Sequence, residues 1–574
     1  MSHMQDAGRP ATALPICCQS LTSFWPAVAS TAQCDPATGR IGALVAVPSD
    51  DESAEVAFRI ETAIGPHPPD CSVEKNSVDC IVSRRVLGYL DHEKLLVPVV
   101  QREVCRGEPC DFDTTCVLGE CVSARIASAL CADAAGCGED ELPTGGAGGA
   151  GGAPADPDAL VYDWAKDFGS ENGADTGVSV AIAPNGTIYL AAEIATDGYS
   201  FSGGMATASD LVIPTFDSTG QYLAEYSTIS GDTTVRALAI DEAGHAYFAG
   251  NTRVQGGDYG DGLIGGESDE DILVGSSDAD GGYRWARAYG NEVFPEASHK
   301  ATDVAVGPDG HVYVAGVVGE SEVIVEEVTV PEGSLWVASY LSDGTSRWVR
   351  HFAGLTSGGR LAFDGGGNLY VAGHFSGALE LGELSSAGGN DVYVAKFDGG
   401  GNAIWATRFG NGDGDQEGID VAVGVDGTVY LAGTTNVPVD FGGELLDLFG
   451  DNHDAFVLAI NADGNHVWSR SIGMATEDAA RAIATSGAGN VFVASSTPIA
   501  SIKQLKSMTA DGSDRWDIPI APTEGTLLLN DLAVGPQGEL LVTGAFQGSI
   551  AFGDDLLESP PDDTQGFLVR YAGQ

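Results

Sequence analysis

The stretch Asp420-Val-Ala-Val-Gly-Val-Asp-Gly-Thr-Val-Tyr-Leu-Ala-Gly433 decides the fold. Apolar residues dominate the segments on both sides of the pair Asp426-Gly427, and this pattern is typical of two short β-strands. An Asp-Gly pair between such strands is a strong hairpin signal, because both central residues of the turn favour positive φ. The sequence therefore predicts a tight antiparallel hairpin at this point.

The same hairpin recurs along the chain, and each copy is followed by a third strand and then by a fourth strand that carries an aromatic residue. The expected first-and-second strand pairs lie at 178–193, 234–250, 302–317, 359–374, 418–433, 479–495 and 528–544. The aromatic residues of the fourth strands, 48 to 63 residues apart, are Tyr226, Trp285, Trp348, Trp405, Trp468 and Trp516. A repeat of this length with four short strands predicts a β-propeller.

The count of repeats also predicts how the ring closes. The seventh repeat has its third strand at 566–571, but the chain ends before a fourth strand. The segment Val161–Lys166 carries Trp164 and has no other partner. We therefore predict an all-β, seven-bladed propeller over 161–574 in which this N-terminal strand completes the last blade. Closure of this kind protects the sheet edges that an open ring would expose.

The recurring motifs Asp-Gly-x-x-Tyr-x-Ala-Gly and Asp-x-Phe/Tyr-Val resemble those of the SBBP-type β-propeller repeat family of exported bacterial proteins. The resemblance covers about 410 residues. It implies an extracytoplasmic binding or scaffold role and carries over no set of catalytic residues. The cysteine-rich segment before the repeats is similar to short cysteine modules of myxobacterial exported proteins.

The cysteines are confined to the N-terminal part of the chain, since all 11 lie at or before Cys137. Such segregation is typical of a small exported domain that is stabilised by disulfides. We expect a cysteine-rich, β-sandwich-like domain over 17–142. The disulfide candidates are Cys71, Cys80, Cys105, Cys110, Cys116, Cys121, Cys131 and Cys137. A zinc site is the alternative, but the gaps between these cysteines are longer than those of the usual CxxC pairs.

Two further segments are predicted to lie outside the folded domains. Residues 1–16 are interpreted as a tag remnant and a flexible N-terminus. Residues 143–160 consist largely of Gly, Ala and Pro and are predicted to be a flexible linker. If the natural protein is exported, a further hypothesis is that it carries a lipid anchor on a cysteine that lies just before Gln5 in the natural sequence.

Charge and hydropathy exclude several classes of partner. The net charge is −55, and such a surface repels nucleic acid and anionic lipid. No apolar run reaches the roughly 18 residues that a transmembrane helix needs. We therefore expect no nucleic-acid partner and no transmembrane segment, and we expect a protein or glycan ligand outside the cytoplasm.

The loops that share one face of the ring hold the candidate site residues. Acidic and aromatic residues in these loops are the candidates for ligand binding: Asp258, Tyr259, Asp261, Asp447, Asp451, Asp554 and Asp555. One loop alternates oxygen-bearing side chains with glycine in a way that suits Ca²⁺, through Asn411, Asp413, Asp415 and Glu417. It lacks the sixth-position Gly and the twelfth-position Glu of an EF-hand loop, so an acidic surface turn is the alternative. No other cofactor is expected.

Two function classes remain. We favour a noncatalytic binding or scaffold protein, and the alternative is a carbohydrate-active hydrolase or lyase. An axial pocket with two carboxylates and converging arginines would favour the enzyme, whereas an axis lined by backbone and small residues would favour binding.

Overall fold

The computed structural model describes two parts of the chain. In the C-terminal part it describes residues 160–572 except for 171–172, 196–199, 202–203, 206–210, 228–232, 253–256, 259–262, 265–270, 291–298, 413, 447–452, 473–477, 497–502, 521, 554 and 561–562. In the N-terminal part it describes the backbone of 17–23, 55–63, 80–88, 114–117, 120–123 and 125–126. The chain divides into two compact units, Met1–Ala153 and Pro154–Gln574.

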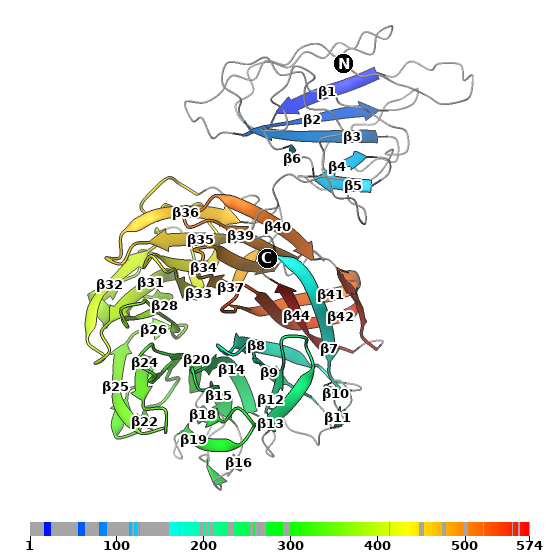
Figure 1. Ribbon diagram of the computed structural model, residues 1–574. Helices are drawn as coiled ribbons and strands as arrows, with labels where there is room; N and C mark the ends of the chain where they lie inside the picture. Colours follow the sequence, from blue (N-terminus) through cyan, green and yellow to red (C-terminus); the bar gives the residue numbers. More distant parts are fainter. Residues whose placement is uncertain are drawn as a thin grey trace. The chain divides into compact units, whose positions relative to one another are not determined.

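The C-terminal unit is a ring of seven small antiparallel sheets around an axis (Figure 1). This arrangement confirms the predicted seven-bladed propeller. Blade 1 consists of β8 (Thr176–Ile182), β9 (Ile188–Glu193), β12 (Leu211–Phe216) and β13 (Tyr222–Ser227). Blade 2 consists of β14 (Thr233–Ile240), β15 (Ala246–Thr252), β18 (Asp271–Ser277) and β19 (Tyr283–Tyr289). Blade 3 consists of β20 (Lys300–Val306), β21 (Val312–Val317), β24 (Ser334–Tyr340) and β25 (Ser346–Ala353).

The remaining four blades follow the same order from the axis outward. Blade 4 contains β26 (Leu355–Thr356), β27 (Arg360–Phe363), β28 (Leu369–Ser376), β31 (Asp391–Phe397) and β32 (Ala403–Phe409). Blade 5 contains β33 (Gln416–Val423), β34 (Val429–Thr435), β35 (Asp454–Ile460) and β36 (His466–Ile472). Blade 6 contains β37 (Ala479–Thr485), β38 (Val491–Ser496), β39 (Lys503–Met508) and β40 (Asp514–Ile520). Blade 7 contains β41 (Pro522–Val534), β42 (Leu540–Phe552), β44 (Gln565–Ala572) and β7 (Val161–Phe168), with β43 (Asp555–Glu558) beside β42.

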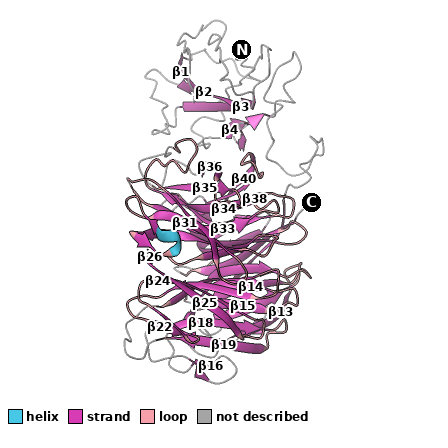
Figure 2. Cartoon of the chain, turned by 90° about the vertical axis from the view of Figure 1, so that its left-hand side faces the viewer, coloured by secondary structure: helices cyan, strands magenta, loops and turns pink. Residues whose placement is uncertain are grey.

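Short two-stranded sheets lie within several of the loops that connect the second and third strands. They are β10 (Ser200–Phe201) with β11 (Gly204–Met205), β16 (Gly257–Asp258) with β17 (Leu263–Ile264), β22 (Val323–Val325) with β23 (Val328–Val330), and β29 (Ala378–Leu379) with β30 (Leu384–Ser385). Seen from its edge, the described part of the ring consists of strands and connecting loops, with a short 3-10 turn at η4 (Leu381–Glu383) (Figure 2). In the part of the chain that the structure describes, no helix has the length and apolar character needed to cross a bilayer.

The last blade joins both ends of the propeller, as the sequence predicts. Strand β7 pairs antiparallel with β44, and Trp164 lies opposite Arg570 in this pairing. Because β7 precedes blade 1 while β44 ends blade 7, the ring is closed by backbone hydrogen bonds between segments about 400 residues apart.

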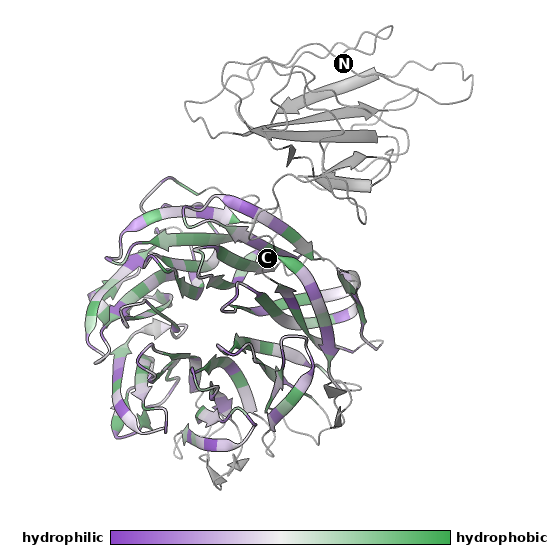
Figure 3. Cartoon of the chain, viewed as in Figure 1, coloured by the Kyte–Doolittle hydropathy of each residue, from purple (hydrophilic) through white to green (hydrophobic). Residues whose placement is uncertain are grey.

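The core lies between the blades and is formed mainly by their middle strands. Figure 3 shows the hydrophobic residues concentrated in these middle strands and the hydrophilic residues on the outer strands. The repeated tyrosines of the second strands, including Tyr313, Tyr370 and Tyr430, are buried and pack against the repeat tryptophans. Tyr313 also packs against Phe363 of the following blade, so these tyrosines belong to the inter-blade core that the sequence predicts.

Several repeat tryptophans pack against a turn of the following blade. Trp348 lies under Gly401, where a Cβ atom would come within 2.8 Å of the indole, and its Nε1 donates to the carbonyl of Gly399 at 3.2 Å. Gly401 also has a φ of +77°, which favours glycine. The same relation joins Trp285 to Gly344 and Trp468 to Gly512. The spacing between Gly and Trp in the repeat is thus required by contacts between neighbouring blades.

The described residues of the N-terminal unit form a sheet and a hairpin. The sheet runs in the order β1 (Cys17–Ser23), β2 (Glu55–Ala63), β3 (Cys80–Gly88) and β6 (Arg125–Ile126). The hairpin is formed by β4 (Thr114–Val117) and β5 (Glu120–Ser123), and its register places Cys116 opposite Cys121.

Candidate functional site

The first strands of the blades surround a cavity of about 700 Å³ on the axis of the ring. All seven blades contribute to its lining, from Thr176 and Ser179 in blade 1 to Asn530 and Asp531 in blade 7. A volume of this size is in the range of sites that hold small ligands. The lining includes the beginnings of first strands and the ends of second strands, so the cavity lies toward the face that carries the long loops.

An irregularity in the first strands determines which side chains face the cavity. In six blades the pairing between the first and second strands shifts by one residue, as at a β-bulge, which locally redirects side chains. The residues after the shift occupy one equivalent position in each blade, which we call the ring position. In blade 4 the strand register places Arg360 at this position. From blade 1 to blade 7 this position holds Ser179, Ala237, Asp303, Arg360, Asp420, Ala482 and Asp531.

The three carboxylates at this position each connect two blades. Asp303 accepts hydrogen bonds from its neighbour Val304 N at 2.8 Å and from Leu361 N of blade 4 at 2.7 Å. Asp420 does the same with Val421 N at 2.9 Å and Ile483 N of blade 6 at 2.8 Å. In each of these two carboxylates, both oxygen atoms therefore accept a backbone amide.

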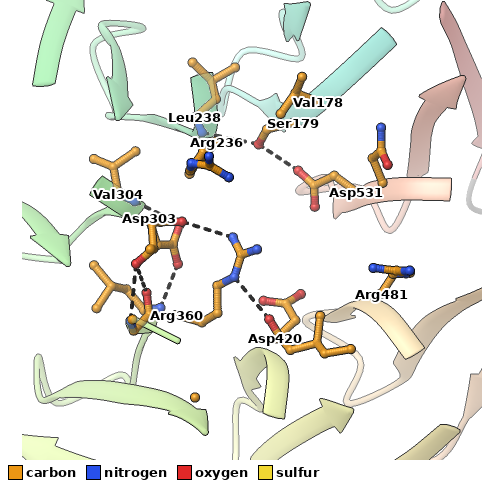
Figure 4. Close-up of a pocket in the computed structure, with 18 of the residues that line it drawn as sticks. Val178, Ser179, Arg236, Leu238, Asp303, Val304, Arg360, Asp420, Arg481 and Asp531 are labelled. Carbon is orange, nitrogen blue, oxygen red and sulfur yellow. Dashed lines mark hydrogen bonds between the residues drawn. The ribbon is translucent and has the colours of Figure 1, made fainter. Parts of the chain in front are cut away.

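Asp531 joins the last blade to the first two. Its Oδ1 accepts from Leu532 N at 2.8 Å, and its Oδ2 accepts from Val180 N at 2.9 Å and from the Ser179 hydroxyl at 2.7 Å. The Ser179 Oγ in turn accepts from Leu238 N of blade 2 at 3.2 Å. Figure 4 shows this chain of contacts at the edge of the cavity.

Arg360 occupies the same position in blade 4 and extends toward both neighbouring blades (Figure 4). Its Nη1 donates to the carbonyl of Thr302 in blade 3 at 3.2 Å, and its Nε donates to the carbonyl of Ile419 in blade 5 at 3.1 Å. The guanidinium therefore lies between the strands that carry Asp303 and Asp420, and its charge partly offsets theirs.

Burial changes the acidity of these carboxyl groups. These groups line the cavity, and desolvation by the surrounding protein raises the pKa of Asp303 to about 6 and the pKa of Asp420 to about 7. Burial also raises the pKa of Asp531. The charge of Arg360 and the backbone hydrogen bonds oppose these increases in pKa but do not cancel them. Near neutral pH the axis thus carries carboxyl groups that are partly protonated.

Two further arginines line the cavity from the blades that have alanine at the ring position. Arg236 precedes Ala237 in blade 2, and its Nε donates to Asn251 Oδ1 at 3.2 Å. Arg481 precedes Ala482 in blade 6 and is exposed to the cavity. His374 also lines the cavity, and its Nδ1 lies 3.2 Å from the carbonyl oxygen of Gly418.

The loop that the sequence predicts as a calcium site is held by contacts within the protein. Asp415 accepts from Asn390 N at 2.8 Å, and Glu417 accepts from the Asn390 side chain at 3.0 Å. Asn411 donates to the carbonyl of Pro438 at 2.8 Å, and Asp413 lies outside the described residues. Within the described ranges there is no group of three or more His, Cys, Asp or Glu side chains that could hold a metal ion. A calcium site therefore stays a prediction from sequence.

The structure gives a contact for one of the acidic and aromatic loop residues that were proposed for ligand binding. Asp555 accepts hydrogen bonds from the Tyr162 hydroxyl and from Ala165 N, both in β7, so its described contacts belong to ring closure. The backbone of Asp258 lies in β16. The remaining candidates lie outside the described residues, and they are Tyr259, Asp261, Asp447, Asp451 and Asp554.

The disulfide candidates fall in the N-terminal unit. The structure describes the backbone at Cys80, Cys116 and Cys121. The other candidates lie outside the described residues, and they are Cys71, Cys105, Cys110, Cys131 and Cys137. Their pairing stays a prediction.

Sequence reasoning missed the charged ring at the axis. Arg236, Arg360 and Arg481 lie on first strands and line the cavity, and none of them is among the site residues that the sequence predicts. An alignment of the seven first strands would have revealed an anomaly: charged residues within the strands that are predicted to be innermost. Such residues are rarely placed there without a partner or a function.

The comparisons with known proteins give structural neighbours only. No protein-family model matches the chain, and no curated protein matches it. A virginiamycin B lyase from Staphylococcus aureus is 11% identical with a TM-score of 0.39, over 71% of this chain and 99% of that one. An ulvan lyase is 12% identical with a TM-score of 0.37, over 68% and 96%. A prolyl endopeptidase is 10% identical with a TM-score of 0.39, over 69% and 50%. At such identities the function has to be argued from this chain's own residues.

Proposed function

We propose that this protein is a noncatalytic, exported binding protein whose propeller takes a protein or glycan ligand at the face that carries the long loops. The single observation that supports this proposal most strongly is the occupation of the axial carboxylates. In Asp303, Asp420 and Asp531 one oxygen accepts the backbone amide of the next residue, and the other oxygen accepts a backbone amide of a neighbouring blade. A general acid or base needs an oxygen within hydrogen-bond reach of the substrate, and these oxygens already have structural partners.

The cavity is nevertheless suited to binding. Hydroxyl, amide and guanidinium groups line it, among them those of Thr176, Thr234, Asn530 and Arg481. Polar groups that converge on a cavity of this volume provide orientation and specificity for a bound ligand. The rigid inner strands hold these groups in place, because hydrogen bonds between blades fix their backbone. A preorganised polar cavity of this kind supports recognition without chemistry.

We propose the cellular location of the protein from its sequence. The SBBP-type repeats are typical of exported bacterial proteins, and the confinement of all 11 cysteines to the N-terminal part favours an oxidising compartment. A lipid anchor in the natural protein would place the propeller at a cell surface. The net charge of −55 supports partners other than nucleic acid or anionic lipid.

A carbohydrate-active hydrolase or lyase is the second candidate, and one observation favours it. The axis carries both carboxylates and arginines, which is the feature that the sequence analysis names as favouring the enzyme. The pKa values of Asp303 and Asp420, about 6 and about 7, lie in the range that general acids use. Under this alternative one of these carboxyl groups would have to exchange its backbone partner for the substrate. The binding proposal requires no such rearrangement.

A single panel of glycans and bacterial surface proteins tests both candidates with the full-length protein. Binding is measured for each member, and turnover is measured as newly formed reducing ends or unsaturated sugar products. We expect at least one member to bind and none to be turned over. Turnover that Asp420→Asn abolishes would replace the binding proposal with the enzyme. A panel without any bound member would overturn the binding proposal.

A further inference from the structure

We propose that the axial cavity recognises the carboxylate group of a small acidic solute or of the acidic end of a glycan, with Arg481 as its main binding residue. This inference rests on the proposed binding function and names the chemical class of its ligand. Its support comes from the position of Arg481, the charge beside it, the size and polarity of the cavity, and the charge of the whole chain.

Arg481 differs from the other arginines of the propeller in having no protein partner for its guanidinium within the described part of the chain. Arg408 pairs with buried Asp391 at 2.7 Å, and Arg470 pairs with Asp514 at 3.1 Å. Arg360 donates to two backbone carbonyls. Arg481 instead lies exposed on the cavity wall, and Figure 4 shows it across the cavity from Asp303.

The ring of inter-blade contacts explains why Arg481 is available. In blades 3, 5 and 7 the ring position holds aspartate and connects neighbouring blades, whereas blade 6 has Ala482 there. The methyl group of Ala482 is too short to reach the next blade. The charged side chain in this blade belongs to the preceding residue, Arg481. The guanidinium thus remains exposed at a rigid position instead of forming part of a joint.

A second cation lies close to Arg481. Lys503 begins β39 in the same blade and is buried, with 4% of its surface exposed. Burial, followed by the charge of Arg481, lowers the pKa of the Lys503 ammonium. The charge of Asp478 acts in the opposite direction on the pKa of Lys503. Arg481, which lines the cavity, is the cation that can attract an anion there. The planar fork of arginine matches the two oxygens of a carboxylate.

The cavity limits the size of the ligand. About 700 Å³ accommodates a small solute or a short saccharide end, and the hydroxyls of Thr176, Thr234 and Thr302 line it. The net charge of −55 disfavours long polyanions, because most of their charges would lie outside the cavity against an acidic surface. A ligand with a single carboxylate satisfies both conditions.

A titration of the full-length protein with matched probes tests this inference. D-glucuronate carries the carboxylate, D-glucose lacks it, and sulfate offers an anion of a different shape, all at equal ionic strength. Ligand-observed NMR gives the Kd for the wild type, for Arg481→Gln and for Arg470→Gln. Arg470→Gln is the matched control, because it removes the same charge from an outer strand of blade 5. We expect glucuronate to bind the wild type and the control equally, and Arg481→Gln to weaken binding by about tenfold or more, as loss of a charged hydrogen bond does.

Each other outcome overturns the inference. If glucuronate fails to bind, or binds Arg481→Gln as tightly as the wild type, Arg481 does not recognise a carboxylate. If glucose or sulfate binds as tightly as glucuronate, the carboxylate class is wrong. The proposed binding function fails separately, because it requires that some member of the protein and glycan panel binds. A panel ligand that binds Arg481→Gln unchanged would preserve the function and reject this inference.

Discussion

The indole Nε1 of Trp164 donates a hydrogen bond to the carbonyl oxygen of Ser218 at 3.1 Å, and this contact connects the last blade to the first. Trp164 lies in β7, which completes blade 7, and Ser218 lies in the outer turn of blade 1. In the same turn a Cβ atom on Gly220 would come within 3.0 Å of the indole. The closing joint therefore uses the same Trp–Gly contact as the joints at Trp285, Trp348 and Trp468.

We expect Trp164→Ala to loosen blade 7 selectively. The substitution removes the packing of a half-buried indole and one hydrogen bond. This loss should lower the free energy of unfolding by about 2–3 kcal/mol. Strand β7 arrives from the other end of the propeller, and it is held to blade 7 by its pairing with β44 and by contacts of Tyr162 with Asp555 and of Asp163 with Arg570. Hydrogen exchange should therefore accelerate in β7 and β44. Trp405→Ala, which removes an equivalent contact to Ala462, is the control and should leave exchange in these two strands unchanged. Equal protection of β7 and β44 in the two variants would contradict the closure mechanism.

Glycine substitutions should separate backbone strain from inter-blade packing. Gly401 and Gly310 have nearly equal φ values, +77° and +74°, so alanine at either position costs about 1–2 kcal/mol in strain. Gly310 has open space around it, whereas a Cβ atom on Gly401 would lie 2.8 Å from the Trp348 indole. Gly401→Ala should therefore lower the free energy of unfolding by roughly 1–3 kcal/mol more than Gly310→Ala, in line with the cost of overpacking. Denaturant titration measures this difference, and equal losses would show that the Trp348 contact is not tight.

Stability should depend on pH through Asp420. Its pKa is about 7 in the folded protein against 3.8 for an ordinary aspartate, so the folded state binds more protons between these values. The stability that protonated Asp420 contributes is complete below pH 4 and is lost as the pH rises toward 7. At about 1.4 kcal/mol per pKa unit, the loss amounts to a few kcal/mol.

Asp420→Asn should reduce this pH dependence, because the amide stays neutral and still offers an oxygen to Ile483 N. Unfolding titrations from pH 4 to pH 8 should show a shallower decline for this variant than for the wild type. Asp463→Asn, at an exposed turn, is the control and should follow the wild type. Parallel curves for all three proteins would show that Asp420 ionises without a stability cost.

Salt should stabilise the protein without a specific effect of calcium. The net charge of −55 causes self-repulsion, which ions screen over a Debye length of about 10 Å at 0.1 M. We expect NaCl and CaCl₂ at equal ionic strength to raise the melting temperature nearly alike. A larger increase in calcium that is lost in Asp413→Asn would instead establish the loop 411–417 as a metal site. Asp413 is the better position to test, since Asp415 supports Asn390 and its removal would destabilise the loop in any salt.

Reduction should affect only the N-terminal unit. A disulfide in a small exported domain contributes ~2–5 kcal/mol, and all cysteines of the chain lie at or before Cys137. Calorimetry should show a propeller transition that reductant leaves in place and an N-terminal transition that reductant lowers. One transition that moves as a whole would contradict both the disulfide and the linker predictions.

Much of the propeller could be predicted because its signals are local. The Asp-Gly turn at Asp426-Gly427 and the apolar alternation around it specify a hairpin within fourteen residues. The unpaired strand around Trp164 then requires a partner, and the incomplete last repeat supplies it. The contact of Trp348 with Gly401 could not be predicted, although both residues belong to the repeat motif, because it joins different blades.

The sequence by itself determined the number of blades, the closing strand and the segregation of the cysteines, since periodicity and turn chemistry act within each repeat. Only the tertiary structure decided that Asp303, Arg360 and Asp420 meet at one level of the axis and that Arg481 faces the cavity. These residues are about 60 residues apart in the chain, and they converge because the twisted sheets pack into a closed ring. In six blades a shift in strand pairing before the ring position selects which side chain faces inward, and this shift depends on backbone geometry that the residue pattern does not specify.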